Sequence, residues 1–108
     1  MGGRGEWTRE IIQVELEPEF EYDPNKSKSN KEKHGIDFEE AKSLWKDSNK
    51  IQYSSKYKEE PRELLFAVYN GKHYTAVITK RNGKVRIISV RRSHEDEVRI
   101  YEKENNDR

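Results

Sequence analysis

The apolar residues of this sequence gather into short periodic segments that long polar stretches separate. The least interrupted segment places four β-branched residues within six positions: Val85, Ile87, Ile88 and Val90. Such a run predicts a strand that is covered on both faces and lies near the middle of a sheet. Arg91 and Arg92 end this strand, and their side chains point to opposite faces because neighbours along a strand alternate.

The residues after these arginines predict a helix. Ser93 and Asp96 have the spacing of an N-cap residue and its capping box. His94, Val98 and Tyr101 then recur at helical spacing, so we expect them to share one face of the helix.

Two Asn-Gly dipeptides, at 70–71 and 82–83, are typical of tight hairpin turns. The first separates β-rich segments at 64–69 and 74–79, and the second leads into the strand that ends in the arginines. With a further strand at 50–57, these segments predict a meander of four antiparallel strands.

A polar helix is predicted before the meander. Asp-Pro at 23–24 begins it and Gly35 ends it. The helix contains no large apolar residue, so the face that turns toward the domain is expected to hold Ser27, Asn30 and His34. Buried polar side chains need hydrogen-bond partners. For His34 the alternatives are a hydrogen-bonded structural clamp and a catalytic role.

A second, short helix follows it. Asp37 and Glu40 repeat the capping-box spacing, and Ala41, Leu44 and Trp45 form its apolar stripe. The order of all these segments predicts an α+β fold with an antiparallel sheet of four to five strands, two N-terminal helices and one C-terminal helix.

The chain divides into an N-terminal extension at 1–18, a domain at 19–104 and a frayed polar tail at 105–108. Within the extension, apolar residues alternate at 12–16 as in a short edge strand. A second brief extended segment is predicted at 20–22.

Charge is divided unevenly along the chain. The formal net charge is +1, but the first 22 residues hold six glutamates and two arginines, a balance of −4, which leaves +5 for the rest. The acidic extension is therefore expected to cover the basic domain in cis, or else the charges are simply solvated. The absence of cysteine and of any long apolar stretch predicts a cytoplasmic protein without a membrane span.

The sequence contains no glycine-rich phosphate loop, no metal-ligand spacing and no recognisable Ser/His/Asp set, so no metal and no cofactor is expected. Two separated stretches nevertheless carry a family resemblance. The first reads FEYDP at 20–24, KHGI at 33–36 and FEEA at 38–41, and the second reads RIISVRR at 86–92, followed by Glu97 and Tyr101. Together they resemble the BrnT family, the toxins of type II toxin–antitoxin systems, over about residues 20–103.

This resemblance implies a RelE-like fold with a twisted sheet and a ribonuclease that arrests translation. It also implies a BrnA-like antitoxin partner with a ribbon-helix-helix DNA-binding part. Operator DNA would then be reached only through the antitoxin, and the toxin would form a hetero-oligomer or a homodimer.

A metal-independent ribonuclease uses the 2′-hydroxyl of its substrate as nucleophile, so it must stabilise phosphorane charge and move protons. The predicted charge stabilisers are Arg86, Arg91 and Arg92, because a guanidinium can bridge two phosphate oxygens. His34 is the predicted general acid or base, and Tyr101 the predicted proton donor or stacking group. For Arg92 and Tyr101 the alternative is structural: an arginine that pairs with Glu97 or Asp96, and a tyrosine that closes the core.

The predicted RNA-binding residues are Lys26, Lys33 and Arg81, although the lysines are equally well read as a solvated surface. Two alternatives to a ribonuclease stay open at this point. One is a non-catalytic module that binds an antitoxin and assists repression, and the other is an RNA-binding domain on the same basic surface.

Overall fold

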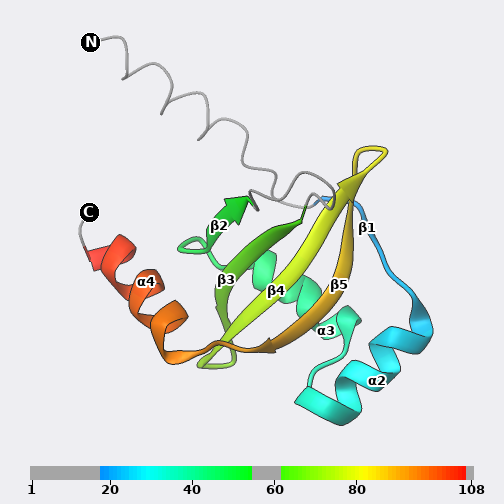
Figure 1. Cartoon of the computed structure of the whole chain (residues 1–108), viewed down its shortest axis with the longest axis horizontal. Coiled ribbons are helices and arrows are strands. Elements are labelled where there is room, and N and C mark those ends of the chain that lie inside the picture. Colours follow the sequence, from blue (N-terminus) through cyan, green and yellow to red (C-terminus); the bar gives the residue numbers. More distant parts are fainter. Residues whose placement is uncertain (1–17, 55–61, 107–108) are drawn as a thin grey trace, which may run out of the picture.

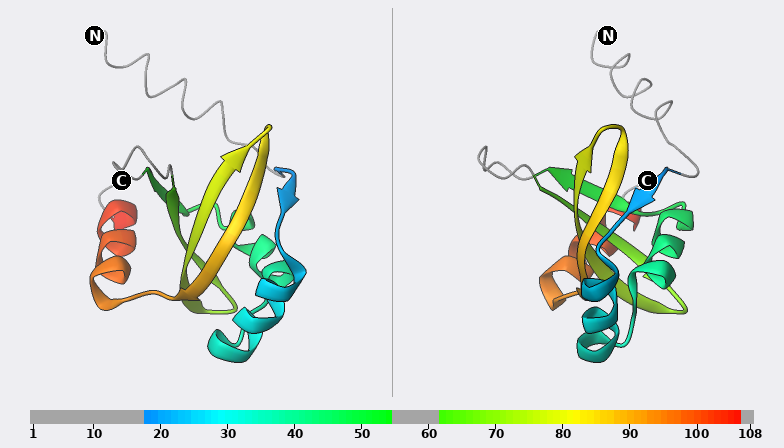
Figure 2. Two further views of the ribbon diagram at one scale, coloured as in Figure 1. Left: turned by 45° about the vertical axis from the view of Figure 1, so that its right-hand side comes forward. Right: turned by 90° about the vertical axis from the view of Figure 1, so that its right-hand side faces the viewer.

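The computed structural model describes residues 18–54 and 62–106, and within them a five-stranded sheet lies between helices on its two sides (Figure 1, Figure 2). The sheet order is β1-β5-β4-β3-β2. The strand and helix bounds are β1 Phe20–Glu21, α2 Pro24–His34, α3 Phe38–Ala41, the 3₁₀ helix η1 Lys42–Lys46, β2 Ile51–Ser54, β3 Glu63–Tyr69, β4 Lys72–Arg81, β5 Lys84–Arg92 and α4 Glu95–Asn106. The strand predicted at 12–16 and the acidic extension before residue 18 fall outside the described residues.

The predicted meander is confirmed, because β2, β3, β4 and β5 pair in antiparallel order. The sheet as a whole is mixed, however, and the prediction of an antiparallel sheet is wrong for its first strand. The short β1 pairs in parallel with β5, in the register Phe20 to Val85 and Glu21 to Arg86. The long connection between these two strands permits either direction, which a two-residue hairpin would not.

The two predicted hairpin turns have the expected backbone. Both residues of each Asn-Gly pair have positive φ, 54° and 73° at 70–71 and 52° and 78° at 82–83. This is the type I′ pattern, whose twist matches that of the flanking strands. The second turn fixes the register in which Arg81 faces Lys84.

The strand β5 is not covered on both faces, and it lies one place from the sheet edge. Val77 pairs with Ser89 and Ile78 with Ile87, so Ile88 is an extra residue in a β-bulge. The bulge shifts the alternation and lets Ile87 and Val90 face the same core although three positions separate them. The continuous apolar run in the sequence therefore comes from a bulge rather than from burial on two faces.

One face of the sheet, here called the core face, packs on α2, α3 and η1. Its buried cluster joins side chains of the helical segment to side chains of three strands: Ile36, Phe38, Ala41, Leu44, Trp45, Leu65, Ala67, Tyr74, Ala76, Ile78, Val85, Ile87 and Val90. The capping box of Asp37 and Glu40 is present and starts α3 where the sequence predicts. The helix turns into 3₁₀ geometry at Lys42, which lets Leu44 and Trp45 both reach the core.

The polar helix α2 is held by hydrogen bonds in place of apolar contacts. Asp23 caps its start and Gly35, with φ of 78°, ends it. The buried Asn30 donates to the carbonyls of Ile36 and Val90, at 2.8 Å each, and accepts from the Val90 amide at 3.2 Å. The prediction that His34 also faces the domain is wrong, because its side chain is exposed at the end of the helix.

The helix α4 lies on the opposite side of the sheet from α2 and α3 (Figure 2). It begins one residue later than predicted, because Glu97 accepts from the His94 amide at 2.8 Å while the Ser93 hydroxyl bonds to Thr75 instead. The helix continues to Asn106, past the predicted fraying at 105, since the Asn105 side chain donates to the Asn49 carbonyl. No helix in the ranges 18–54 and 62–106 is long and apolar enough to cross a membrane.

Candidate nucleic-acid interface

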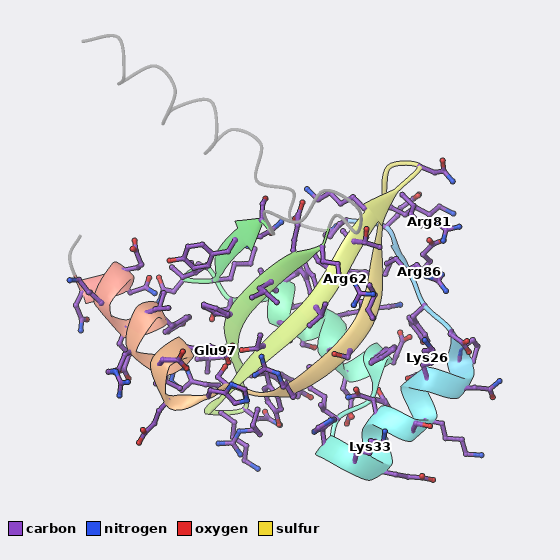
Figure 3. All side chains as sticks on the ribbon, in the orientation of Figure 1. Lys26, Lys33, Arg62, Arg81, Arg86 and Glu97 are labelled. Atoms are coloured by element: carbon purple, nitrogen blue, oxygen red, sulfur yellow. The ribbon has the colours of Figure 1, made fainter. Side chains whose placement is uncertain are left out.

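The face of the sheet opposite the core face, here called the outer face, carries most of the chemistry-bearing side chains. Strand register and alternation place on it Glu21, Leu64, Phe66, His73, Thr75, Val77, Thr79, Arg81, Arg86, Ser89 and Arg91. The helix α4 packs on this face near the end of β5, where Glu97 reaches Thr75 and the Tyr101 ring meets the His73 ring edge-on at 5.0 Å. Two arginine–glutamate clusters lie at the two ends of β5: one contains Arg81 and Arg86, and the other contains Glu97 (Figure 3).

The first cluster joins Glu21, Arg81 and Arg86. The Oε2 atom of Glu21 lies 3.6 Å from Nε of Arg81 and 3.6 Å from Nη1 of Arg86. These distances are ion-pair distances and exceed the range of an N–H···O hydrogen bond. The N–H groups of both guanidiniums therefore keep the capacity to bind another oxygen anion.

The strand β1 explains why Glu21 stands there. Phe20 packs edge-on against Trp45 at 4.9 Å and anchors the strand in the core. Because neighbours along a strand alternate, Glu21 must then project to the outer face, beside its ladder partner Arg86. From β4, the long side chain of Arg81 reaches across β5 to the same carboxylate.

Arg62 lies one residue before β3, next to this cluster. The pairing of Glu63 with Ile78 places Arg62 in the row that continues through Thr79 to Arg86. In Figure 3 the labelled Arg62, Arg81 and Arg86 lie toward the same end of the sheet, opposite to Glu97. One end of the outer face is thus strongly basic.

The second cluster is built differently. Arg91 and Glu97 form a two-point pair, with Nη1 to Oε1 at 2.8 Å and Nη2 to Oε2 at 2.9 Å. The same Oε1 also accepts from the Thr75 hydroxyl and the His94 amide. Hydrogen bonding from Arg91, together with these donors, lowers the pKa of Glu97 to about 2 in spite of its burial.

Arg92 points to the core face, as the alternation of β5 predicts, and its guanidinium lies 5.8 Å from the centre of the Tyr74 ring. The predicted pairing of Arg92 with Glu97 or Asp96 is wrong, since Arg91 is the residue that takes Glu97. The two adjacent arginines thus have different surroundings: Arg91 is locked in a hydrogen-bonded pair, and Arg92 stacks at the exposed end of the strand.

Tyr101 is buried and closes the space between α4 and the segment after η1. Its hydroxyl donates to Oδ2 of Asp47 at 2.8 Å, and the Val68 amide donates to the same oxygen. Burial and the bond to Asp47 raise the pKa of Tyr101 to about 12. This geometry matches the structural alternative for Tyr101 that the sequence left open.

The remaining predicted residues lie away from the outer face. Lys26 and Lys33 are exposed on α2, which packs along the edge of β5 (Figure 3). Lys26 lies toward the Arg86 end and Lys33 at the far end. The side chain of His34, at the end of the same helix, makes no hydrogen bond or ion pair with the residues that the structure describes. Of the predicted site residues, the fold therefore brings together Arg81 and Arg86, and it separates them from His34, Arg91, Arg92 and Tyr101.

Sequence reasoning missed Glu21 and the roles of Thr75 and Asp47. Glu21 had one usable signal, since a strand that buries Phe20 must expose its neighbour on the other face. The partner strand was not predictable, because β1 and β5 are more than 60 residues apart. Among the described residues no group of three or more His, Asp or Glu is placed to hold a metal ion.

Comparison with known proteins bears on this geometry. The model of one family, described as the ribonuclease toxin BrnT of type II toxin–antitoxin systems, matches residues 22–97. This stretch spans most of the chain and includes α2, the four-stranded meander and the start of α4. No curated protein matches the chain.

Proposed function

Because the chain belongs to the BrnT family of ribonuclease toxins of type II toxin–antitoxin systems, we propose that its outer face binds and cleaves RNA without a metal ion. The observation that carries this proposal is the pair Arg81 and Arg86. Both guanidiniums lie on the outer face, each 3.6 Å from one carboxylate oxygen, with N–H groups that no hydrogen bond to that carboxylate uses.

These arginines suit a phosphate that passes through a phosphorane. A guanidinium is always charged and can bridge two phosphate oxygens, so two of them on one face can hold the phosphate and stabilise the charge that develops on it. Half-buried apolar side chains of the outer face, such as Leu64 and Val77, provide a surface for ribose and base. His34, Arg91, Arg92 and Tyr101 stay as predictions for a direct role in the reaction.

The family implies an antitoxin partner, and we propose a BrnA-like protein with a ribbon-helix-helix DNA-binding part. A basic RNA-cleaving surface is silenced most directly by covering it. An acidic or amphipathic segment of the antitoxin would therefore lie over or beside β5, between Arg86 and Arg92. Operator DNA would be bound by the antitoxin rather than by this chain, and the fold proposed for the toxin is RelE-like.

The test is expression of the chain without an antitoxin, together with cleavage of RNA by the purified protein. Arg81→Ala and Arg86→Ala should each relieve growth arrest and lower kcat/KM by about 10²-fold or more, since removing one oxyanion-stabilising donor costs about that much. The matched control is Arg99→Ala, an exposed arginine on α4 that lies 4.0 Å from Glu95.

The control should arrest growth like the unsubstituted chain. Melting temperatures of all variants must stay within a few degrees, which separates lost chemistry from lost folding. Full toxicity of both Arg81→Ala and Arg86→Ala would place the active site elsewhere. A chain that neither arrests growth nor cleaves RNA would favour the non-catalytic module.

A further inference from the structure

The two arginine–glutamate clusters on the outer face differ in one respect that bears on chemistry. Glu97 has both carboxylate oxygens occupied by hydrogen-bond donors. The Oε2 atom of Glu21 is buried, and no described residue donates a hydrogen bond to it. Each such atom in a native structure calls for an explanation, because an unsatisfied buried acceptor costs free energy.

We propose that Glu21 is the general base of the RNA cleavage reaction, acting between Arg81 and Arg86. This inference rests on the proposed function, because it assigns a role within the same phosphate site. A general base needs a carboxylate that is held in place and is still able to accept a proton. Glu97 meets only the first condition, whereas Glu21 meets both.

The fold supplies each of these conditions for Glu21. The two guanidiniums lie 3.6 Å from Oε2 as counter-charges and leave the lone pairs of the carboxylate free of hydrogen bonds from them. The anchor of Phe20 on Trp45 and the parallel pairing of β1 hold the carboxylate in position. The side chain of Glu21 is 29% exposed, compared with 11% for Glu97. Because Oε2 is buried beside the two guanidiniums, the substrate hydroxyl approaches the other carboxylate oxygen, Oε1.

The proposed step balances as follows. Glu21 takes the proton of the ribose 2′-hydroxyl, and the 2′-oxygen forms a bond to the adjacent phosphorus. The bond from phosphorus to the 5′-oxygen of the next nucleotide breaks, and that oxygen takes a proton from water. The products are a 2′,3′-cyclic phosphate and a 5′-hydroxyl, and Glu21 returns its proton to solvent. Arg81 and Arg86 stabilise the negative charge on the phosphorus oxygens throughout.

A second reading of the same contact is inhibitory: Glu21 would occupy the arginines and keep phosphate out. The two readings predict opposite effects of Glu21→Gln. A lost general base lowers kcat by about 10²–10⁴-fold, the usual contribution of such a group. A lost competitor raises RNA affinity and leaves the cleavage rate equal or higher.

The experiment measures kcat, KM and the pH profile of kcat for the full chain, Glu21→Gln and Glu21→Asp. The proposal expects a large loss of kcat in Glu21→Gln, with the acidic limb of the pH profile removed. In Glu21→Asp, which keeps a carboxylate, the limb should return. Binding of a 2′-O-methyl RNA oligonucleotide, which cannot be cleaved, should be unchanged or tighter in Glu21→Gln.

The matched control is Glu39→Gln, an exposed carboxylate that pairs with Lys42 at 3.0 Å, away from the outer face. Its kcat and pH profile should equal those of the unsubstituted chain. A kcat for Glu21→Gln within about threefold of the unsubstituted value, or above it, overturns the proposal. A near-normal kcat for Glu21→Gln together with an inactive Arg86→Ala overturns only the role of Glu21. An unsubstituted chain that does not cleave RNA overturns the proposed function itself.

Discussion

At the scale of single residues, the outer face shows that neighbouring charges do not have interchangeable roles. Arg91 has the short, two-point hydrogen bonds of a structural pair, while Arg81 and Arg86 keep ion-pair distances to their carboxylate. From sequence alone Arg86 and Arg91 were equivalent predictions for charge stabilisation, and Arg81 was predicted only to bind RNA. The difference depends on which carboxylate the fold delivers to each, and side-chain spacing along one strand does not contain that information.

The Glu97 pair gives a prediction of pH-dependent stability. The pKa of Glu97 is lowered from 4.5 to about 2, so its ionised form stabilises the fold above about pH 4.5. This contribution, about 3 kcal/mol by linkage, is lost as the pH falls from about 4.5 toward 2, because the unfolded chain takes up the proton first. Urea unfolding at pH 7 should therefore show Glu97→Gln less stable by about 2–3 kcal/mol, since Arg91 loses its charge partner.

At pH 2 the two proteins should differ much less, because the carboxyl is then protonated in the unfolded chain and about half protonated in the folded chain, so nearly all of the linkage contribution is lost. Glu102→Gln, an exposed residue on the same helix, should unfold like the unsubstituted chain at both pH values. An equal gap between Glu97→Gln and the unsubstituted chain at pH 7 and pH 2 would show that packing, and not ionisation, carries the effect.

At the scale of elements, α2 is held to the sheet by one side chain rather than by an apolar stripe. Asn30 bonds to both the amide and the carbonyl of Val90, as a neighbouring strand would, and also to the Ile36 carbonyl. The side-chain amide of Asn30 thus forms hydrogen bonds to the edge of β5 where the two-residue strand β1 no longer pairs with it. The same side chain ties the loop after α2 to the sheet.

Replacing Asn30 should therefore lower the free energy of unfolding by more than the loss of one small side chain would suggest. Asn30→Ala leaves three backbone groups without that partner in a buried place, and we expect a loss of about 2–4 kcal/mol in the free energy of unfolding. Ser29→Ala, at an exposed position of the same helix, is the control and should stay within about 0.5 kcal/mol. Chemical denaturation measures both, and a loss below about 1 kcal/mol for Asn30→Ala would mean that water replaces the amide.

Elements with strong local signals were predictable from sequence: α2 with its Asp23 cap and Gly35 end, the capping box of α3, and both Asn-Gly hairpins. The failures share a cause, since each depends on a contact between distant segments. The bulge at Ile88 is visible only in the pairing with β4, and the parallel direction of β1 only in its pairing with β5. The start of α4 shifted because Thr75, on another strand, takes the Ser93 hydroxyl.

At the scale of the whole molecule, charge is arranged around the sheet rather than spread evenly. The basic end of the outer face holds Arg62, Arg81 and Arg86, and α2, which packs against β5, adds four exposed lysines: Lys26, Lys28, Lys31 and Lys33. Lys31 is paired with Glu40 at 2.8 Å, so it contributes less to an external field. A single strand of RNA that crosses the outer face toward the edge formed by β1 would next meet α2.

This arrangement predicts that the lysines of α2 contribute to RNA binding and not to the reaction, and the salt dependence of binding can test this. Each lysine that neutralises an RNA phosphate changes the slope of log affinity against log salt by about 0.7 for single strands. Lys26→Ala/Lys33→Ala should therefore weaken binding of uncleavable RNA at low salt and reduce the slope by up to about 1.4, with kcat unchanged. A matched double variant at exposed lysines outside α2, Lys72→Ala/Lys103→Ala, should retain the slope. An unchanged slope in Lys26→Ala/Lys33→Ala would show that these lysines are only solvated, and a loss of kcat would move them into the reaction itself.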